Sequence, residues 1–392
     1  MERIIIPIAF LSTVLVFWML PRAWRTAFLT LASTSMLLWL DPAPVAIMVC
    51  IAAGTFGYLR LAEGRPAWTT PIAFGLLIAG IASYLVVVKY LPGLDALARG
   101  STAPAPIVPV GLSYLTFRLI HYAIETHAGR LPVHSFVEFM AYVTFVPIFS
   151  AGPIERFDRF LAHRVQVCSR NDLRDGLQRI ILGMIKAFAL PTLILWGTAF
   201  DSLEGVADSL LASAGGPAAA LVWTALAVTT LSFYLNFAGY SDIAIGSARL
   251  LGFGIAENFN RPILSTSIVE FWRRWHITLG EWARTYVFFP ASRLVQSATL
   301  GALLSFMVIG LWHAGTIHWL AYGLWHGCGV IVANAYTKRG WRLSHNAQLA
   351  AGLGWLLTMG FVTLGTAFPV LSGRGSLVDS ITLIAAAFGV RL

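Results

Sequence analysis

Residues 299–313 read TLGALLSFMVIGLWH, and residues 316–336 read TIHWLAYGLWHGCGVIVANAY. Neither segment contains Asp, Glu, Lys or Arg; the second has 21 residues and reaches the roughly 20 that a helix needs to cross a bilayer, and the first has 15. The whole chain of 392 residues has this character: 57% is hydrophobic, 11% is charged, and the mean hydropathy is +0.74. A soluble domain carries roughly a quarter charged residues. The sequence therefore predicts an all-α, polytopic membrane protein and argues against a soluble enzyme or a nucleic-acid-binding protein.

Apolar segments of comparable length recur along the chain. Several are short, so we expect about nine to eleven to cross the bilayer and the others to be re-entrant or to lie at its surface. The first segment lacks a small-residue cleavage site and is expected to be a retained helix. No repeat or linker is visible, which predicts one membrane-embedded domain over residues 1–392. The segments lie at residues 4–20, 27–40, 44–59, 70–90, 107–127, 136–153, 177–199, 218–238, 299–313, 316–336, 347–370 and 376–390.

Charge asymmetry predicts the orientation. Basic residues are densest over residues 155–186 and recur over 249–274, whereas residues 201–208 carry only acidic charges. Because Lys and Arg are enriched in cytoplasmic loops, the first two stretches are expected inside and residues 201–217 outside. The formal net charge of +9 is therefore attributed to these loops, and no nucleic-acid partner is expected.

Arg130 also favours the cytoplasmic side, so residues 136–153 do not fit a simple span between two cytoplasmic loops. A re-entrant or half-crossing segment resolves the conflict if its irregular backbone is buried in protein or lines a cavity. Pro147, Gly152 and Pro153 favour such a broken helix.

Four polar residues recur at helical spacing within an otherwise apolar segment. If residues 114–125 form a helix, these side chains lie within about 60° of one another. One interpretation is an ion pair that holds two helices together, and the other is the wall of a hydrated tunnel or substrate funnel. The four residues are Tyr114, Arg118, His121 and Glu125.

Residues 270–284, EFWRRWHITLGEWAR, are expected to form one amphipathic helix at the membrane interface. Trp272, Trp275, Leu279 and Trp282 share its apolar face, and the charged residues occupy the opposite side. The tryptophans are expected to be anchored at headgroup depth, with the charges in water. His276 lies at the edge of the aromatic face and is expected to point towards the protein or the bilayer. A structural role and a catalytic role both remain open for it.

Three more histidines lie in or beside the segments quoted first, at His313, His318 and His326. Their spacing places them on different helical faces, and no carboxylate lies nearby, so no metal site is expected. A neutral intramembrane histidine is a good general base, while tightly packed helices with satisfied imidazoles are the alternative. Small residues that allow close helix packing accompany them at Gly310, Ala314, Gly315, Gly323 and Gly327.

Four blocks resemble the membrane-bound O-acyltransferases, specifically the bacterial branch that contains alginate O-acetylases and the teichoic-acid D-alanyl transfer protein. They occur in the family's order within residues 109–327, and their combination is specific. The blocks are PVGLSYLTF with the following Glu125 (109–125), FVPIFSAGPIERF (145–157), NFAGYSDIAIG with LLGFGIAENFNRPILS (236–265), and EFWRRWHITLGEWARTYVF continuing to GLWHAG and GLWHG (270–327).

This resemblance implies a helical bundle around a central tunnel, with an acyl donor entering from the cytoplasm and an acceptor from the opposite face. It assigns the active-site histidine to His313, where the motif's usual Gly is Ala314. It assigns the family's second characteristic histidine to His276. Supporting or tunnel-lining roles follow for His326, Arg273, Trp312, Tyr114, Arg118, His121, Glu125, Asp242, Asn258 and Asn260.

The blocks differ in the branch that they resemble. The 236–265 block is similar to the acetylases and is the longest match, which favours acetyl transfer from acetyl-CoA to an extracytoplasmic polysaccharide. SYLTF, Glu125, SAGPIERF and the 36 residues between His276 and His313 favour D-alanyl transfer from a phosphopantetheine carrier protein. A transporter or flippase without covalent chemistry is the alternative from a different class.

The resemblance also implies the surroundings of the protein. No cofactor is expected to be bound, because acetyl-CoA is a substrate. The acyl group is expected to reach the polysaccharide through a separate SGNH-hydrolase-like protein, since the loops of this chain are too short to contain such a domain. The expected location is the bacterial inner membrane, with the chain crossing the lipid bilayer several times.

Overall fold

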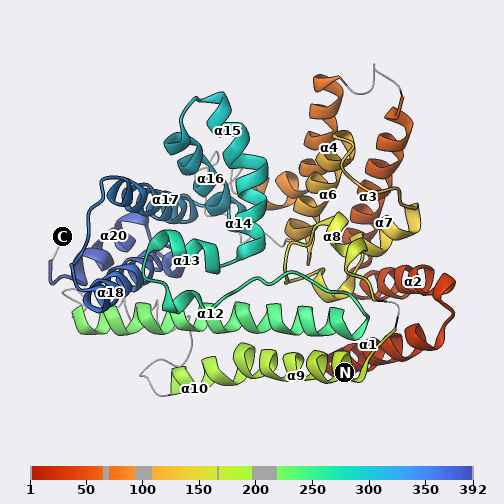
Figure 1. Cartoon of the computed structure of the whole chain (residues 1–392), viewed down its shortest axis with the longest axis horizontal. Helices are drawn as coiled ribbons and strands as arrows, with labels where there is room; N and C mark the ends of the chain where they lie inside the picture. Colours follow the sequence, from red (N-terminus) through yellow and green to blue (C-terminus); the bar gives the residue numbers. More distant parts are fainter. Residues whose placement is uncertain (1, 65–69, 93–107, 166, 197–218, 391–392) are drawn as a thin grey trace. The chain divides into compact units, whose positions relative to one another are not determined.

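The structure is a computed structural model that describes residues 2–64, 70–92, 108–165, 167–196 and 219–390. The acidic loop expected outside the cell, residues 201–217, lies outside the described residues. Within the described ranges the chain is helical and contains no β-strand (Figure 1), and one isolated antiparallel bridge joins Arg164 and Phe253.

The helices follow the predicted apolar segments closely. Their bounds are α1 (Glu2–Met19), α2 (Arg22–Leu40), α3 (Pro42–Ala62), α4 (Pro71–Lys89), α6 (Leu112–His127), α7 (Phe136–Val143), α8 (Phe157–Ala162), α9 (Arg170–Met184), α10 (Leu190–Trp196), α12 (Ala219–Leu250), α13 (Ile268–Arg274), α14 (Ile277–Ala283), α15 (Phe289–Leu294), α16 (Ala298–His313), α17 (Ile317–Lys338), α18 (Ala347–Gly365), α19 (Ala367–Leu371) and α20 (Leu377–Ala386).

Five helical stretches of the described chain are long and apolar enough to cross a membrane. This finding confirms the all-α, polytopic membrane class, while the number of crossings stays a prediction. Three shorter apolar helices accompany these five, at Ile6–Met19, Ala298–His313 and Leu377–Ala386. The five stretches are Pro42–Ala62, Pro71–Lys89, Arg170–Leu195, Ala219–Leu250 and Ala347–Leu371.

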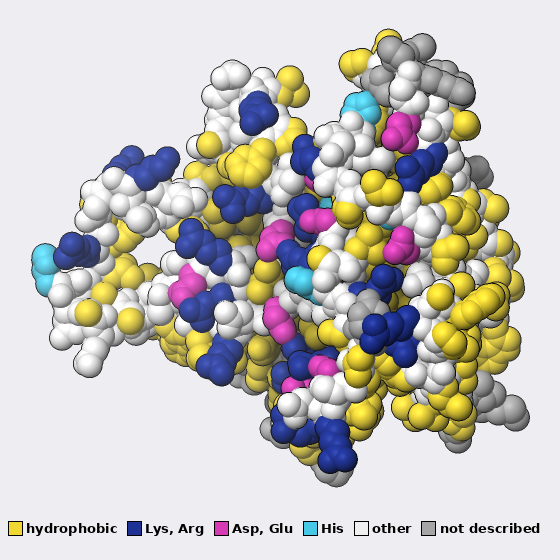
Figure 2. Space-filling view, turned by 45° about the vertical axis from the view of Figure 1, so that its right-hand side comes forward, with side chains coloured by type: hydrophobic (Ala, Val, Ile, Leu, Met, Phe, Trp, Pro, Cys, Tyr) yellow, Lys and Arg dark blue, Asp and Glu magenta, His cyan; other side chains and the backbone are white. Residues whose placement is uncertain are grey.

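Large apolar side chains lie on the outside of these helices. Ile72 and Leu76 of α4 are 79% and 69% exposed, and Leu15 and Met19 of α1 are also exposed. Hydrophobic side chains cover much of the face shown in Figure 2. Water-soluble monomers rarely expose apolar patches of this extent, so lipid is the solvent that these faces fit.

The chain divides into two compact units. Unit 1 comprises Met1–Gly183 and Tyr240–Glu257, and unit 2 comprises Met184–Gly239 and Asn258–Leu392. Helix α12 therefore contributes residues to both units.

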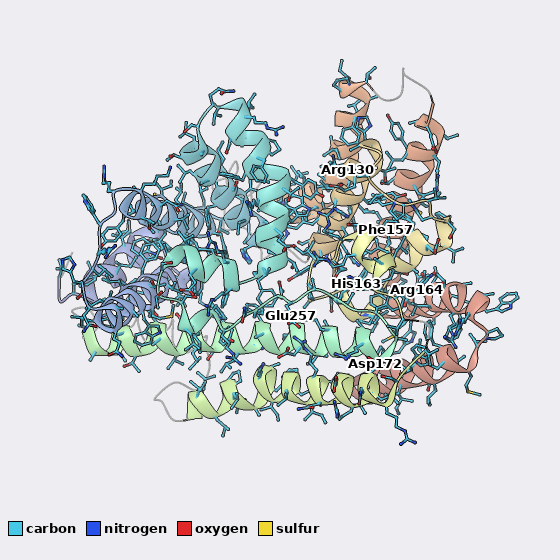
Figure 3. The ribbon with its side chains drawn as sticks, in the orientation of Figure 1. Arg130, Phe157, His163, Arg164, Asp172 and Glu257 are labelled. Atoms are coloured by element: carbon cyan, nitrogen blue, oxygen red, sulfur yellow. The ribbon has the colours of Figure 1, made fainter. Side chains whose placement is uncertain are left out.

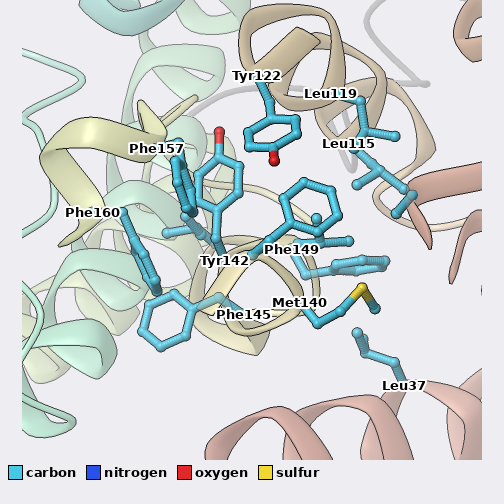
Figure 4. Packing of buried hydrophobic residues seen from close by; sticks show 14 of the residues in the cluster. Leu37, Leu115, Leu119, Tyr122, Met140, Tyr142, Phe145, Phe149, Phe157 and Phe160 are labelled. Atoms are coloured by element: carbon cyan, nitrogen blue, oxygen red, sulfur yellow. The ribbon is translucent and has the colours of Figure 1, made fainter. Parts of the chain in front are cut away.

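The core of unit 1 is rich in aromatic side chains (Figure 4). Tyr142 contacts Phe157 and Phe160 edge-on, with ring centroids 5.2 and 5.5 Å apart, and Phe160 stacks on Phe253. Offset and edge-on pairs of this kind contribute about 0.5–1.5 kcal/mol each beyond their buried area. They hold the short helices α7 and α8 in the core of the unit.

The segment expected to be a broken helix is broken. Helix α7 ends at Val143, and one 3₁₀ turn follows at Val146–Ile148. Eight residues of α-helix rise about 12 Å, which is too short to cross a bilayer.

In unit 2, α16 and α17 approach so closely that their backbones touch. A Cβ atom at Gly310 would overlap the Trp319 carbonyl, and one at Gly323 would overlap the Phe306 carbonyl. At Gly327 the added atom would lie 3.1 Å from the Phe306 Cβ. The close packing expected from these small residues is confirmed at the three glycines.

The close approach predicts that Gly323→Ala destabilises unit 2. The added methyl group meets a backbone carbonyl that cannot rotate away, so we expect a loss of about 1–3 kcal/mol of unfolding free energy. Thermal unfolding in detergent micelles measures the change. Gly352→Ala in α18 is the matched control: nothing lies within 4 Å of its added atom, and alanine favours a helix. Equal unfolding temperatures for the two variants would contradict the prediction.

Candidate active site

The prediction of a single amphipathic helix over residues 270–284 is wrong. The chain forms α13 and α14 instead, and between them Trp275 is extended and His276 has a left-handed backbone with φ of 43°. Non-glycine residues adopt this conformation rarely, and it clusters at functional sites. The apolar and charged faces predicted for one continuous helix over residues 270–284 therefore do not hold across the break.

Hydrogen bonds from a distant segment stabilise this interruption. The Ile277 amide donates to the Asn258 carbonyl at 2.9 Å, and the Asn260 amide donates to the Arg274 carbonyl at 2.9 Å. A helix break leaves backbone groups without their intrahelical partners, and burying them unpaired is costly. The segment that follows α12 supplies those partners.

The tryptophans of this segment pack within unit 2. The Trp272 ring lies edge-on to Phe306 of α16 with centroids 4.9 Å apart, and Trp275 stacks on Phe271 at 5.4 Å. Trp282 is buried. These rings therefore contact other residues of unit 2, and their expected anchoring at headgroup depth stays a prediction.

His276 is almost completely buried, at 1% exposure, as its predicted orientation away from bulk water requires. Its Nδ1 lies 3.0 Å from the Asn258 Oδ1. The same oxygen accepts hydrogen bonds from the Thr278 hydroxyl at 2.9 Å and from the Thr278 amide at 3.4 Å. Because an amide oxygen only accepts, His276 must donate from Nδ1.

The proton on Nδ1 leaves a lone pair on Nε2 of the neutral ring. Within the described residues no hydrogen-bond partner of this nitrogen is present. Burial and the neighbouring His313 imidazole lower the pKa of His276 well below its ordinary value. His276 is therefore neutral at physiological pH, with Nε2 as a buried acceptor.

Aromatic rings surround the two histidines. Phe237 lies edge-on to His276 with centroids 4.7 Å apart, and Trp312 lies at 6.1 Å from the same ring. His313 is the last residue of α16, is partly buried, and stacks on Trp319 at 4.5 Å. Unit 2 thus brings together His276, His313, Trp312 and Asn258 of the predicted set.

His326 is fully buried on α17. The Trp272 indole N–H donates to its Nδ1 at 3.3 Å, so Nε2 carries the proton of the neutral ring. Within the described chain, Nε2 has no hydrogen-bond acceptor, and a Cβ placed on Gly365 would lie 3.2 Å from it. His326 is thus a buried donor, opposite in polarity to His276.

Two other predicted residues of unit 2 lie nearer the surface. The Arg273 side chain is exposed at the end of α13, and Asn260 is exposed while its backbone supports the helix break. Asp242 belongs to unit 1, where it forms an ion pair with Arg179 at 3.0 Å.

The polar stripe of unit 1 lies on α6 as expected, but its members bind different partners. Glu125 pairs with Arg130 at 2.6 Å, and His121 accepts from the Phe157 amide at 3.1 Å, with Arg130 and Phe157 labelled in Figure 3. Arg118 donates to the Tyr142 carbonyl at 2.9 Å. Tyr114 is partly buried at the start of the helix. A tunnel wall formed by these residues stays a prediction.

Sequence reasoning did not single out Glu155, which is 1% exposed in unit 1. Its carboxylate accepts from the Ala256 amide at 2.7 Å and from the Arg156 amide at 3.0 Å. Burial raises the pKa of Glu155 despite these bonds. Glu155 anchors the chain two residues before Asn258, and a lone acidic residue in the apolar SAGPIERF block was the available signal.

Comparison of the sequence with known proteins identifies the family of this chain. A model of the membrane-bound O-acyltransferase family matches residues 17–350. The chain belongs to this family. The match includes every residue of the histidine cluster in unit 2, and it confirms the resemblance that the four sequence blocks indicated.

Relatives from both expected branches are similar to this member of the family. A protein named probable alginate O-acetylase from Pseudomonas aeruginosa is 32% identical over 330 residues, which are 79% of this chain and 60% of the relative. One of the same name from Pseudomonas syringae pv. tomato is 28% identical over 91% of this chain and 71% of the relative. A teichoic acid D-alanyltransferase from Streptococcus thermophilus is 30% identical over 67% of this chain and 68% of the relative. The chain spans about 60% of the length of the Pseudomonas aeruginosa protein.

The role of Asn258 predicts that Asn258→Ala destabilises unit 2. The change leaves the buried donors of His276 and Thr278 without their shared acceptor, which costs about 1–3 kcal/mol. Chemical unfolding in micelles measures the loss. Asn260→Ala in the same motif removes an exposed side chain and should change stability by less than about 0.5 kcal/mol. A loss of similar size in the two variants would refute this role of Asn258.

Glu270 predicts a loss of stability in acid. Its carboxylate accepts from the Thr266 amide at 2.7 Å and pairs with Arg274 at 2.6 Å. The Thr266 amide bond, more than the Arg274 charge, lowers the pKa of Glu270. The resulting stability is present above the ordinary glutamate pKa of about 4.3 and is lost as the pH falls through the lowered pKa.

Glu270→Gln should therefore unfold more easily than the wild type at pH 7, and the difference should shrink as the pH falls below about 4. Unfolding midpoints measured across this pH range provide the test. A difference independent of pH would show that the carboxylate charge contributes nothing.

Proposed function

We propose that this protein transfers an acetyl group from acetyl-CoA, a cytoplasmic thioester, to a hydroxyl acceptor on the way to an extracytoplasmic polysaccharide. The observation that carries the proposal is that the buried His276 and the partly buried His313 are neighbours, with Asn258 fixing the His276 imidazole as an acceptor. Membership of the acyltransferase family and the names of the acetylase relatives support it.

In the proposed reaction the acceptor oxygen attacks the thioester carbonyl carbon. A carbon–oxygen bond forms, the carbon–sulfur bond breaks, and His313 takes the hydroxyl proton and passes it to the leaving thiolate. A buried site excludes water and so suppresses hydrolysis of the thioester. Holding donor and acceptor together in one site lowers the entropic part of the reaction barrier.

The tautomer of His276 limits the kinds of hydrogen bond that this ring can make with a substrate. An Nε2 lone pair accepts a hydrogen bond, whereas stabilising the developing oxyanion needs a donor. We therefore assign His276 to orienting a substrate through one of the substrate's own N–H or O–H groups. Arg273 is exposed at the end of α13, and its proposed contribution is attraction of the anionic donor.

The wider setting belongs to the same proposal. The protein binds no cofactor, and an SGNH-hydrolase-like partner receives the acyl group outside the cytoplasm. The chain crosses the bacterial inner membrane several times. Support comes from its apolar helices and from the relatives named for modification of polysaccharide or teichoic acid.

D-alanyl transfer from a phosphopantetheine carrier protein is the second candidate. A relative named teichoic acid D-alanyltransferase favours it, because its 30% identity is close to the 32% of the acetylase relative. The chemistry at the histidine pair would be the same, since both donors are thioesters.

The proposal predicts that His313→Gln abolishes acetyl transfer without loss of the protein from the membrane. Loss of a general base typically lowers a rate by about 10²–10⁴-fold. Membranes that contain the partner proteins are given acetyl-CoA labelled in the acetyl group, and label is measured in polysaccharide. His345→Gln, at an exposed position, is the control and should retain activity.

Transfer that persists in His313→Gln removes this residue from the role of base. Absence of label from folded wild-type protein rejects acetyl-CoA as the donor. The same assay with a D-alanyl-loaded carrier protein then tests the second candidate.

A further inference from the structure

Arg118 is 0% exposed in the core of unit 1, near the middle of α6. Its guanidinium lies 5.5 Å from the centre of the Tyr142 ring and 5.9 Å from that of Phe149. Figure 4 shows these two rings among the buried aromatic side chains. Nη1 donates to the Tyr142 carbonyl at 2.9 Å.

The other edge of this guanidinium has no acceptor among the described residues. Within the described part of the chain, neither Nε nor Nη2 of Arg118 has a hydrogen-bond partner. These two nitrogens form one edge of the planar fork, and their parallel N–H groups match two oxygens of a carboxylate or a phosphate.

Other arginines of unit 1 show what this edge normally binds. Arg130 uses Nε and Nη2 to hold both oxygens of Glu125, at 2.6 and 3.1 Å. Arg156 holds Asp158 in the same way, at 3.1 and 3.4 Å. Arg25 points this edge at the backbone carbonyls of Leu20 and Trp18.

Acidic groups of unit 1 near α6 already bind other partners. Glu125 is held by Arg130, and Asp158 is held by Arg156. Glu155 accepts from two backbone amides. The guanidinium stays charged at every accessible pH, and a buried charge without an oppositely charged partner is strongly unfavourable.

We infer that the Nε and Nη2 edge of Arg118 binds a phosphate group of a ligand. A phospholipid headgroup and a phosphate-bearing soluble molecule such as coenzyme A both carry this group. This edge is covered in the structure, so binding requires neighbouring side chains to move aside. Two parallel N–H groups then donate to two phosphate oxygens, and the rings of Tyr142 and Phe149 keep the guanidinium in place. The inference rests on unit 1 alone and does not require the proposed acyl transfer.

The test uses the full chain in maltoside micelles and a phosphate-free buffer. Two probes are added separately, phosphatidylglycerol in mixed micelles and coenzyme A in solution, and the unfolding temperature is recorded. Binding to the folded protein raises this temperature. At least one probe should raise it for the wild type.

Three variants identify the residue responsible. Arg118→Lys keeps the charge but loses the paired N–H groups, and Arg118→Met removes the charge. Either change should lower the affinity for the probe that stabilises the wild type by at least tenfold. Arg25→Lys is the matched control, because Arg25 also lies over aromatic rings, and it should respond like the wild type.

Arg118→Met also loses the hydrogen bond from Nη1 to the Tyr142 carbonyl, so each variant is compared with itself in the presence and the absence of a probe. If Arg118→Met fails to fold, Arg118→Lys decides the question. A response to lipid alone assigns a headgroup, and a response to coenzyme A alone assigns a soluble ligand. The inference is overturned if the wild type responds to neither probe, or if both Arg118 variants respond as it does.

Discussion

One amide oxygen, the Oδ1 of Asn258, fixes the conformation on which the histidine pair of unit 2 depends. It accepts hydrogen bonds from the imidazole of His276 and from two groups of Thr278, while the Asn258 carbonyl accepts from Ile277. An uninterrupted helix would give the backbone its own partners and would need none of these bonds. Because Asn258 supplies them, the chain turns sharply at His276 and directs the ring into the protein.

Polarity distinguishes the buried histidines more clearly than position does. His276 donates from Nδ1 and has an acceptor at Nε2, whereas His326 accepts at Nδ1 and has a donor at Nε2. Their partners, an amide oxygen and an indole N–H, decide which tautomer each ring adopts. Two rings of the same chemical type therefore offer opposite groups within one unit.

Apolar composition predicted most of the helices because these segments carry almost no charge, as in α16 and α17. It failed over residues 270–284, where the break depends on hydrogen bonds to Asn258, 18 positions before His276. No local pattern reveals a partner at that distance. The histidines were singled out by their place in or beside apolar segments, and the family motifs assigned their roles and added Asn258. Glu155 was missed because its partner, the Ala256 amide, lies 101 positions away. The lack of a hydrogen-bond partner for Nε and Nη2 of Arg118 among the described residues could not be predicted from the sequence, because it depends on the positions of individual atoms.

The contact between α16 and α17 has a mechanical consequence for His313. Backbone atoms, not side chains, meet at Gly310 and Gly323, so no rotamer change can widen the gap. The end of α16 that carries His313 is therefore part of a stiff wall. A change of shape beside His313 would therefore have to come from its aromatic neighbours Trp312 and Trp319, and not from separation of α16 and α17.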